Sequence, residues 1–166
     1  MQFMGLPIGG SSEVFIKQLE EKGFVQISTF ETMTTLYGKF ANEIVELCVL
    51  ASPKTNTVCK VIVYFPEKDT WSELRKDYFT KKHLYQEKYL IDTSFEFFSD
   101  PYDEGDGYEL RAIKADKCHY ITFFNDIYGK IAVSVDTKPR VKVTYEDPAS
   151  MKIAQDELKS KAFDDI

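Results

Sequence analysis

Four strand-like segments joined by very short polar links are the feature that most constrains how this chain can fold. The segments are rich in β-branched and aromatic residues, which favour extended backbone. The links span only two, three and six residues, too few for the crossover that parallel neighbours need. Consecutive strands must therefore run antiparallel, and we expect a meander with strands at Val25–Phe30, Met33–Phe40, Ile44–Ala51 and Val58–Phe65.

Helix signals precede this meander, follow it and end the chain. Thr70 and Glu73 form a capping box, and apolar residues recur after it on one face of a helix. Asp147 and Pro148 are a typical N-cap and first-turn pair. The apolar stripe of the second helix consists of Trp71, Leu74, Tyr78, Tyr85 and Tyr89. Helices are expected over 11–22, 70–90 and 148–163.

The second half of the chain repeats the order of the first. Strand-like segments resume at Thr93–Ser99, Tyr108–Ala115, Cys118–Asn125, Gly129–Asp136 and Arg140–Tyr145. The fold class is therefore α+β: a helix and a four-stranded antiparallel meander, duplicated as pseudo-repeats 1–66 and 67–147, with a C-terminal helix at 148–163. The alternative is one continuous mixed domain. In both cases 166 residues fit a single compact domain.

Charge and hydropathy exclude several classes of partner. Of a net charge of −6, the excess lies in residues 91–126, which carry nine acids and three bases. A phosphate backbone would be repelled there, so nucleic acid is not expected as a partner. No apolar run approaches the roughly 18 residues of a membrane span. Met1–Ser12 lacks the pattern of a signal peptide, and an odd and sparse set of three cysteines favours free thiols in a reducing compartment. We therefore expect a cytoplasmic protein. The alternative is a periplasmic or secreted protein whose signal peptide was removed.

Scattered segments resemble small Bacteroides-type proteins that have no assigned function. The segments are Gly5–Ser11, Lys22–Phe24, Val63–Pro66, Thr70-Trp71, Asp100–Tyr102, Asp103–Glu109 and Lys117-Cys118. A helix followed by an antiparallel meander, repeated, is also similar to the fold of β-lactamase inhibitory protein and of the BamE component of outer-membrane assembly. The fold resemblance implies protein–protein binding on an exposed sheet face. That implication is an analogy, because a fold does not fix a function.

An acidic loop at 100–109 is the first candidate contact with a basic partner. Charge complementarity steers such encounters, and loop tips often carry function. The loop could also hold Ca²⁺, but the spacing of an EF-hand fails, so no metal site is expected. The predicted partner-binding residues are Asp103, Glu104 and Asp106 with Tyr102 and Tyr108.

A glycine- and serine-rich helix start is a second, weaker candidate. Gly9, Gly10, Ser11 and Ser12 precede a helix, where free N–H groups attract anions. The lysine and glycine spacing of phosphate-binding loops is missing. A loop with a helix cap explains the same residues. The corresponding alternative function is a small-ligand or nucleotide-binding protein that uses this helix start or a cleft between the repeats.

The two histidines bear on catalysis. His83 is expected on the polar side of the second helix, beside Lys81 and Lys82. His119 alternates with apolar residues on a strand, and a base there would need a nucleophile or an acid brought in by the fold. No catalytic or cofactor motif is present. We therefore expect no catalytic residues and no cofactor, with an unrecognised hydrolase around His119 as the alternative.

Adjacent phenylalanines cannot all point into one core. Phe97 and Phe98 are neighbours, as are Phe123 and Phe124, and successive residues of a strand face opposite sides. Either the closing helix and loops cover the outer rings, or an aromatic surface is exposed, as in binding hot spots. We expect a non-enzymatic protein-binding module, such as an inhibitor, an immunity or antagonist protein, or an accessory factor.

Overall fold

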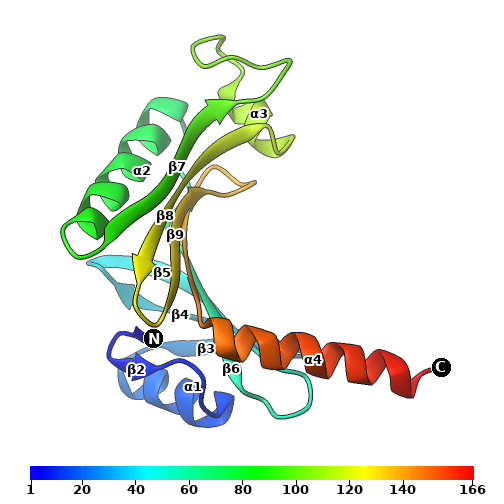
Figure 1. Ribbon diagram of the computed structural model, residues 1–166. Helices are drawn as coiled ribbons and strands as arrows, with labels where there is room; N and C mark the ends of the chain where they lie inside the picture. Colours follow the sequence, from blue (N-terminus) through cyan, green and yellow to red (C-terminus); the bar gives the residue numbers. More distant parts are fainter. The chain divides into compact units, whose positions relative to one another are not determined.

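The computed structural model describes all residues, Met1–Ile166, and shows an α+β protein with four helices and a large antiparallel sheet (Figure 1). The eight strands of this sheet follow the order β3-β4-β5-β6-β10-β9-β8-β7. The chain forms two compact units. Unit 1 contains Met1–Val63, Ile127–Lys130 and Thr144–Ile166, and unit 2 contains Tyr64–Asp126 and Ile131–Val143.

Unit 1 contains the predicted meander. Its strands occur in chain order within the sheet, and β4 pairs antiparallel with both neighbours. A small hairpin of β1 and β2, which no sequence pattern predicted, precedes the first helix. The elements are β1 (Gln2–Phe3), β2 (Leu6–Pro7), α1 (Ser12–Glu21), β3 (Val25–Phe30), β4 (Met33–Phe40), β5 (Glu43–Ala51) and β6 (Val58–Tyr64).

Helix α1 packs on this meander through an apolar side that ends in a buried ring. Phe15 and Leu19 are buried, and Gly23 ends the helix region with a φ of +96°, a left-handed conformation that glycine commonly supplies at helix ends. Phe24 follows and is also buried. A Cβ at Gly38 of β4 would lie only 2.3 Å from the Phe24 ring. The ring therefore occupies the space that any larger residue at position 38 would need.

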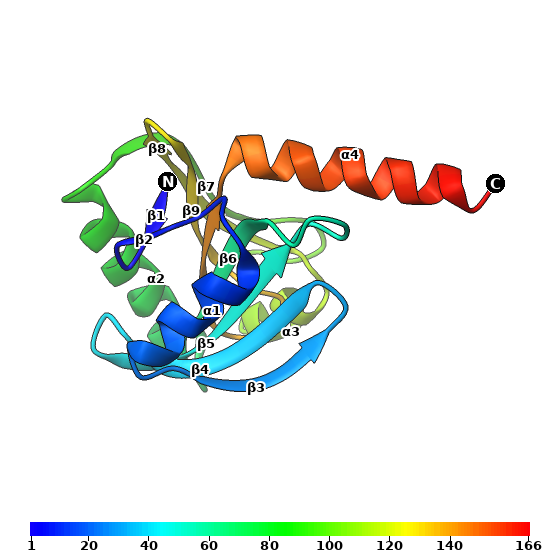
Figure 2. The same cartoon turned by 90° about the horizontal axis from the view of Figure 1, so that it is seen from below.

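Helix α4 (Pro148–Asp164) ends the chain and extends away from the strands of its own unit (Figure 2). Asp147 caps it by accepting a hydrogen bond from the Ser150 N–H at 2.9 Å, as predicted. Ala154 is buried, but Leu158 is 57% exposed. The apolar residues of this helix are therefore covered only near its start.

Glu157 holds α4 to the loop between β5 and β6. Its carboxylate accepts hydrogen bonds from the backbone N–H of Lys54 at 2.9 Å and of Thr55 at 3.2 Å, and from the Thr55 hydroxyl at 2.5 Å. The Thr55 hydroxyl is the main cause that lowers the pKa of Glu157 to about 2. The ionised carboxylate is therefore the form that makes this contact.

Stability should depend on Glu157 in a defined pH range. Its pKa in the fold lies below the ordinary value of 4.5, so its contribution is present above 4.5 and is lost as the pH falls toward 2. We expect Glu157→Gln to reduce the loss of stability over that range, measured by urea unfolding at several pH values. Asp156→Asn is the control, because Asp156 pairs only with Lys152 on the exposed side of α4. An unchanged pH profile in Glu157→Gln would contradict this role.

Unit 2 departs from the predicted second meander. The segment 108–115, predicted as a strand, contains helix α3, in which Ala112 and Ile113 are buried. Its residues Glu109–Lys114 are mostly good helix formers, and the Ala112 N–H bonds to the Tyr108 carbonyl at 2.9 Å. The other elements are α2 (Trp71–Gln86), β7 (Leu90–Phe98), α3 (Glu109–Lys114), β8 (Cys118–Asp126), β9 (Gly129–Val135) and β10 (Val141–Glu146).

Helix α2 begins at the predicted capping box but ends at Gln86 and not at residue 90, because β7 starts at Leu90. Tyr89 of the predicted stripe therefore lies beyond the helix, and the packing of the helix itself needs one further correction. Thr70 accepts a hydrogen bond from the Glu73 N–H at 3.2 Å, and Leu74, Tyr78 and Tyr85 are buried. His83 is exposed, but Lys81, predicted on the polar side, is only 5% exposed. Position 81 belongs to the same helical face as 74, 78 and 85, so the lysine is carried into the core. None of the four helices has the length and apolar composition needed to cross a bilayer.

Candidate functional site

The acidic loop uses Glu104 to fasten itself to the rest of unit 2. One carboxylate oxygen accepts hydrogen bonds from the Arg75 Nε at 3.0 Å and the Trp71 Nε1 at 3.3 Å. The other accepts the Tyr120 hydroxyl at 2.6 Å. Burial, and then the bond to Glu104, raise the pKa of Tyr120 well above its ordinary value. Glu104 therefore anchors the loop to α2 and β8, which sequence reasoning did not foresee.

Two further acids shape the loop internally. Asp106 accepts hydrogen bonds from the backbone N–H of Asp103 at 3.0 Å and of Tyr108 at 2.7 Å. Glu109 is buried and accepts the Gly105 N–H at 2.9 Å. Carboxylates that bond to nearby N–H groups stabilise turns. The predicted residues thus share one loop, in which Asp103 and Tyr108 are exposed and Tyr102 is half-buried.

The glycine-serine segment is joined to a neighbouring strand. The Ser12 N–H bonds to the Asn56 carbonyl at 2.9 Å, and the Val58 N–H bonds to the Gly10 carbonyl at 2.9 Å. The Ser11 side chain makes no capping bond, while a Cβ at Gly9 would lie 3.1 Å from the Ser150 hydroxyl. One of the N–H groups that an anion would need therefore already has a partner. The geometry favours a structural role for these residues.

An exposed row of phenylalanines lies on one face of β7 and β8. Phe95 is 47% exposed, Phe97 is 50% exposed and Phe123 is 36% exposed. Across the two strands Phe95 pairs with Ile121 and Phe97 with His119, and paired residues point to the same side of a sheet. We call Phe95, Phe97 and Phe123 the aromatic strip. It is the exposed aromatic surface expected when adjacent phenylalanines of a strand point to opposite faces of the sheet.

Helix α2 covers the opposite face of the same two strands (Figure 1). Trp71 packs edge-on against Phe98, with ring centroids 5.1 Å apart, and Tyr85 lies 5.9 Å from the buried Phe124. Each pair of adjacent phenylalanines is therefore split, with one ring under α2 and the other in the aromatic strip. The alternative in which helix and loops cover the outer rings is wrong.

His119 and Ser99 meet at the end of the aromatic strip. The Ser99 hydroxyl contacts the His119 Nε2, and the imidazole lies 4.9 Å from the Phe97 ring at an angle of 33°. A hydroxyl beside an imidazole supplies two of the groups of a nucleophile–base–acid triad, the nucleophile and the base. No carboxylate bonds to His119 to orient the ring as a triad requires. Sequence reasoning named His119 but missed Ser99, because only strand pairing brings together residues that are twenty positions apart.

Comparisons of the chain with protein-family models, with curated proteins and with solved structures find no match. The resemblances to small Bacteroides-type proteins, to β-lactamase inhibitory protein and to BamE therefore stay predictions. What the chain does has to be inferred from its own geometry.

A polar network beneath α2 joins this helix to the β7–β8 pair. The Tyr78 hydroxyl lies 2.6 Å from the Thr122 hydroxyl, which in turn lies 2.9 Å from that of Ser94. Glu96 accepts from Lys82 at the edge of this network. Burial raises the pKa of Tyr78 to about 12, so its hydroxyl stays neutral. Satisfied buried networks of this kind fix one arrangement of the strands that carry them.

Proposed function

We propose that this protein is a non-enzymatic module that binds another protein through the aromatic strip. The observation that carries the proposal is the exposure of Phe95, Phe97 and Phe123, between 36% and 50%, on one face of two paired strands. Grouped exposed aromatic side chains are costly in water and are enriched in interface hot spots. They also contribute large contact areas with little loss of side-chain entropy.

Preorganisation supports a binding role for this surface. The opposite face of β7 and β8 is fixed by α2 and by the Tyr78 network, so little ordering would be required when a partner arrives. Rigid surfaces lose less entropy on binding than flexible ones. Strand β7 is also the last strand of the sheet. Its outer edge can pair with an extended segment of the partner, which would continue the strip onto the added strand.

Charge indicates what kind of surface the partner offers. Residues 91–126 carry nine acids and three bases, and Asp92, Asp100 and Asp103 are exposed among them. A partner with an apolar centre and a basic rim would match this segment. Because Glu104 bonds to α2 and β8 and Asp106 bonds within the loop, the loop contributes less to contact than its sequence predicts. The aromatic strip is the main contact in this proposal.

The Ser99–His119 contact is the one observation that favours the hydrolase alternative. The imidazole lacks an orienting carboxylate, and both side chains are only half-buried. Water would therefore compete for any charge that develops there, whereas catalytic electrostatics depend on excluding it. If the protein were a hydrolase centred on this pair, His119→Ala would abolish its activity. In a binding module it would remove a single contact at the end of the strip.

Site-specific photo-cross-linking tests the proposal, because it can capture a partner that has not yet been identified. A benzophenone amino acid at Phe97 should capture a defined protein from an extract of the source cells. The same amino acid at Phe30 is the control, because Phe30 is also an aromatic strand residue and is 69% exposed. Capture of one protein from position 97 and not from position 30 is expected. Identical patterns from both positions would contradict the proposal.

A further inference from the structure

Strand β7 leaves one backbone edge unpaired. It is the last strand of the sheet, and it pairs with β8 in a regular register from Thr93 to Phe98. No backbone hydrogen bond joins this run to any other part of the chain. An extended strand with free N–H and C=O groups can pair with a segment of another chain. The edge of β7 therefore offers a defined pattern of hydrogen-bonding groups.

The register determines which of these groups are free. Just beyond the paired run, the Ser99 N–H bonds to the Lys117 carbonyl at 2.8 Å. In an antiparallel pair, residues that exchange backbone bonds alternate with residues that do not. Counting back from Ser99, every second residue bonds to β8, and the residues between them direct their N–H and C=O groups outward. The outward groups belong to Ser94, Glu96 and Phe98, whose side chains contact α2.

The two faces beside this edge differ in character. Phe95 and Phe97 of the aromatic strip lie on one face. On the other face Glu96 already accepts a hydrogen bond from Lys82, which also donates to the Ser94 hydroxyl at 3.1 Å. An added strand would place alternate side chains beside apolar rings and beside polar groups, because successive residues of a strand point to opposite faces. Apolar residues at every second position match this edge.

Acidic residues lie at both ends of the edge. Asp92 stands at the irregularity between Ile91 and Thr93, and Asp100 follows the strand. Both are exposed. Opposite charges on paired strands stabilise the pair, and like charges destabilise it. A segment with a basic residue at each end fits these acids, whereas a second copy of β7 paired about Glu96 would place two carboxylates opposite each other.

Strand β3, the other end strand of the sheet, is less suited to such a segment. Its register with β4 shifts between Gln26 and Ser28, and a bulge inside a strand interrupts pairing and twists the edge. The regular run of β7 covers six residues, Thr93–Phe98. Strand β3 also carries no charged side chain, so it has no acids to select basic ends.

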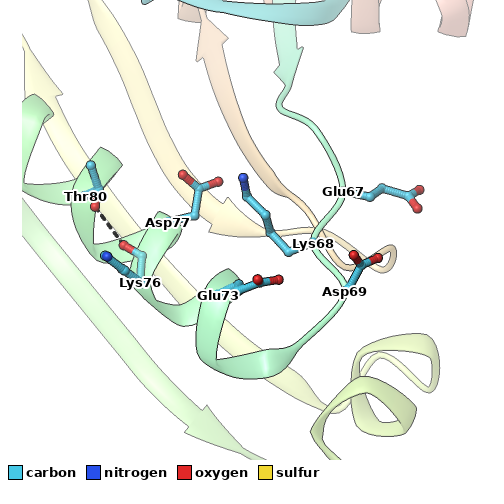
Figure 3. A pocket seen from close by; sticks show the side chains of 7 residues that line it. All are labelled: Glu67, Lys68, Asp69, Glu73, Lys76, Asp77 and Thr80. Atoms are coloured by element: carbon cyan, nitrogen blue, oxygen red, sulfur yellow. Dashed lines mark hydrogen bonds between the residues drawn. The ribbon is translucent and has the colours of Figure 1, made fainter.

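A pocket of about 360 Å³ beside the start of α2 offers no alternative place for the segment (Figure 3). All of its lining residues are polar or charged, with four carboxylates and two ammonium groups. Apolar side chains would gain no apolar contact there, whereas the aromatic strip supplies it. The lining residues are Glu67, Lys68, Asp69, Glu73, Lys76, Asp77 and Thr80.

We infer that the edge of β7 receives an extended segment of the partner protein that runs antiparallel to it, with a branched or aromatic side chain at every second position and a basic residue at each end. The apolar side chains lie beside Phe95 and Phe97, and the backbone bonds to Ser94, Glu96 and Phe98. Antiparallel pairing is slightly more stable per residue than parallel pairing. This inference rests on the proposed function and specifies the segment that the aromatic strip accepts.

N-methylated peptides test the inference, because a methyl group on a backbone nitrogen removes a donor and blocks pairing on that side. The probe is Lys-Thr-Val-Thr-Phe-Thr-Val-Lys with acetylated and amidated ends. In the antiparallel arrangement its threonine N–H groups face β7, and its valine and phenylalanine N–H groups face solvent. The unmodified peptide should bind with a Kd below about 1 mM by calorimetry. Methylation of the threonine nitrogens should weaken binding at least about tenfold, and methylation of the valine and phenylalanine nitrogens less than about threefold.

Three results with these peptides would overturn the inference. They are no binding of the unmodified peptide at about 1 mM, equal affinities of the two methylated peptides, and the reverse order of their affinities, which parallel pairing would give. A peptide with glutamate in place of both lysines tests the charge at the ends. It should bind more weakly at low salt, and equal binding would contradict the assignment of basic ends.

Ser94→Pro separates this inference from the proposed function. Proline removes an outward N–H and is tolerated on an edge strand, and Ser94→Ala is the control for loss of the hydroxyl. Ser94→Pro should abolish peptide binding, and Ser94→Ala should retain it. Unchanged capture of a partner from position 97 in folded Ser94→Pro would overturn the inference and leave the aromatic strip as the interface. Peptide binding to the edge without any capture from position 97 would instead contradict the proposed function.

Discussion

Lys81→Met should lower the free energy of unfolding by about 3 kcal/mol or more, since removal of one partner leaves a buried charge uncompensated. The Lys81 and Asp77 side chains are only 7% and 10% exposed, with a Nζ to Oδ1 distance of 2.6 Å. The ammonium also lies 4.3 Å from the centre of the Phe65 ring. Methionine keeps most of the lysine stem in place. The loss therefore measures the charge and not the packing, and urea unfolding at neutral pH reports it.

A matched control is present in the same chain. Lys152 and Asp156 form an ion pair with the same helical spacing, at 3.0 Å, but their side chains are 75% and 66% exposed. Lys152→Met should change stability by less than about 0.5 kcal/mol. The double change Lys81→Met with Asp77→Leu should be less harmful than Lys81→Met alone, because the buried Asp77 carboxylate is then removed together with its ammonium partner. Equal effects of Lys81→Met and Lys152→Met would show that Asp77 is solvated.

Gly38→Ala should lower the free energy of unfolding by about 1–3 kcal/mol through overpacking. The new Cβ would lie between 2.3 and 2.7 Å from three atoms of the Phe24 ring, well inside van der Waals contact. Phe24 is 3% exposed and cannot move into solvent without losing its burial. Because the φ of Gly38 is not positive, the change tests the close approach of the ring and not backbone strain.

Three companion variants isolate that cause. Gly10→Ala is the control, since no atom lies within 4 Å of its added Cβ and its φ is not positive either. It should be close to neutral. Phe24→Leu combined with Gly38→Ala should cost less than the sum of the two single changes, because the smaller side chain makes room. Thermal unfolding of the four variants and of the unmodified protein tests this cause, and additive effects of Phe24→Leu and Gly38→Ala would contradict the proposed clash.

Local patterns predict much of unit 1 and the start of unit 2. Short polar links determine the meander from β3 to β6, and Gly23, Thr70 and Asp147 mark helix ends by chemistry that acts within a few residues. The strand predicted for residues 108–115 is wrong, because apolar residues in a short run fit a strand or a helix equally well. The burial of Lys81 was detectable, since it lies seven positions after Leu74 on the helix face.

The candidate site depends on contacts that no local pattern encodes. Glu104 bonds to residues 16, 29 and 33 positions away, so its carboxylate appears free in the sequence and is engaged in the fold. Ser99 meets His119 only through the register of β7 with β8. The split between adjacent phenylalanines was predictable from alternation along a strand, but which face α2 would cover was not.

The affinity of the captured partner for a strip variant tests the central proposal most directly. Phe95, Phe97 and Phe123 would be changed together to Ser, and Ile27 and Phe30 of β3, which are 57% and 69% exposed, would be changed to Ser as the control. Calorimetry with the purified partner should show affinity at least about 100-fold weaker for the strip variant and nearly unchanged for the control. A folded strip variant that binds as tightly as the unmodified protein would contradict the account.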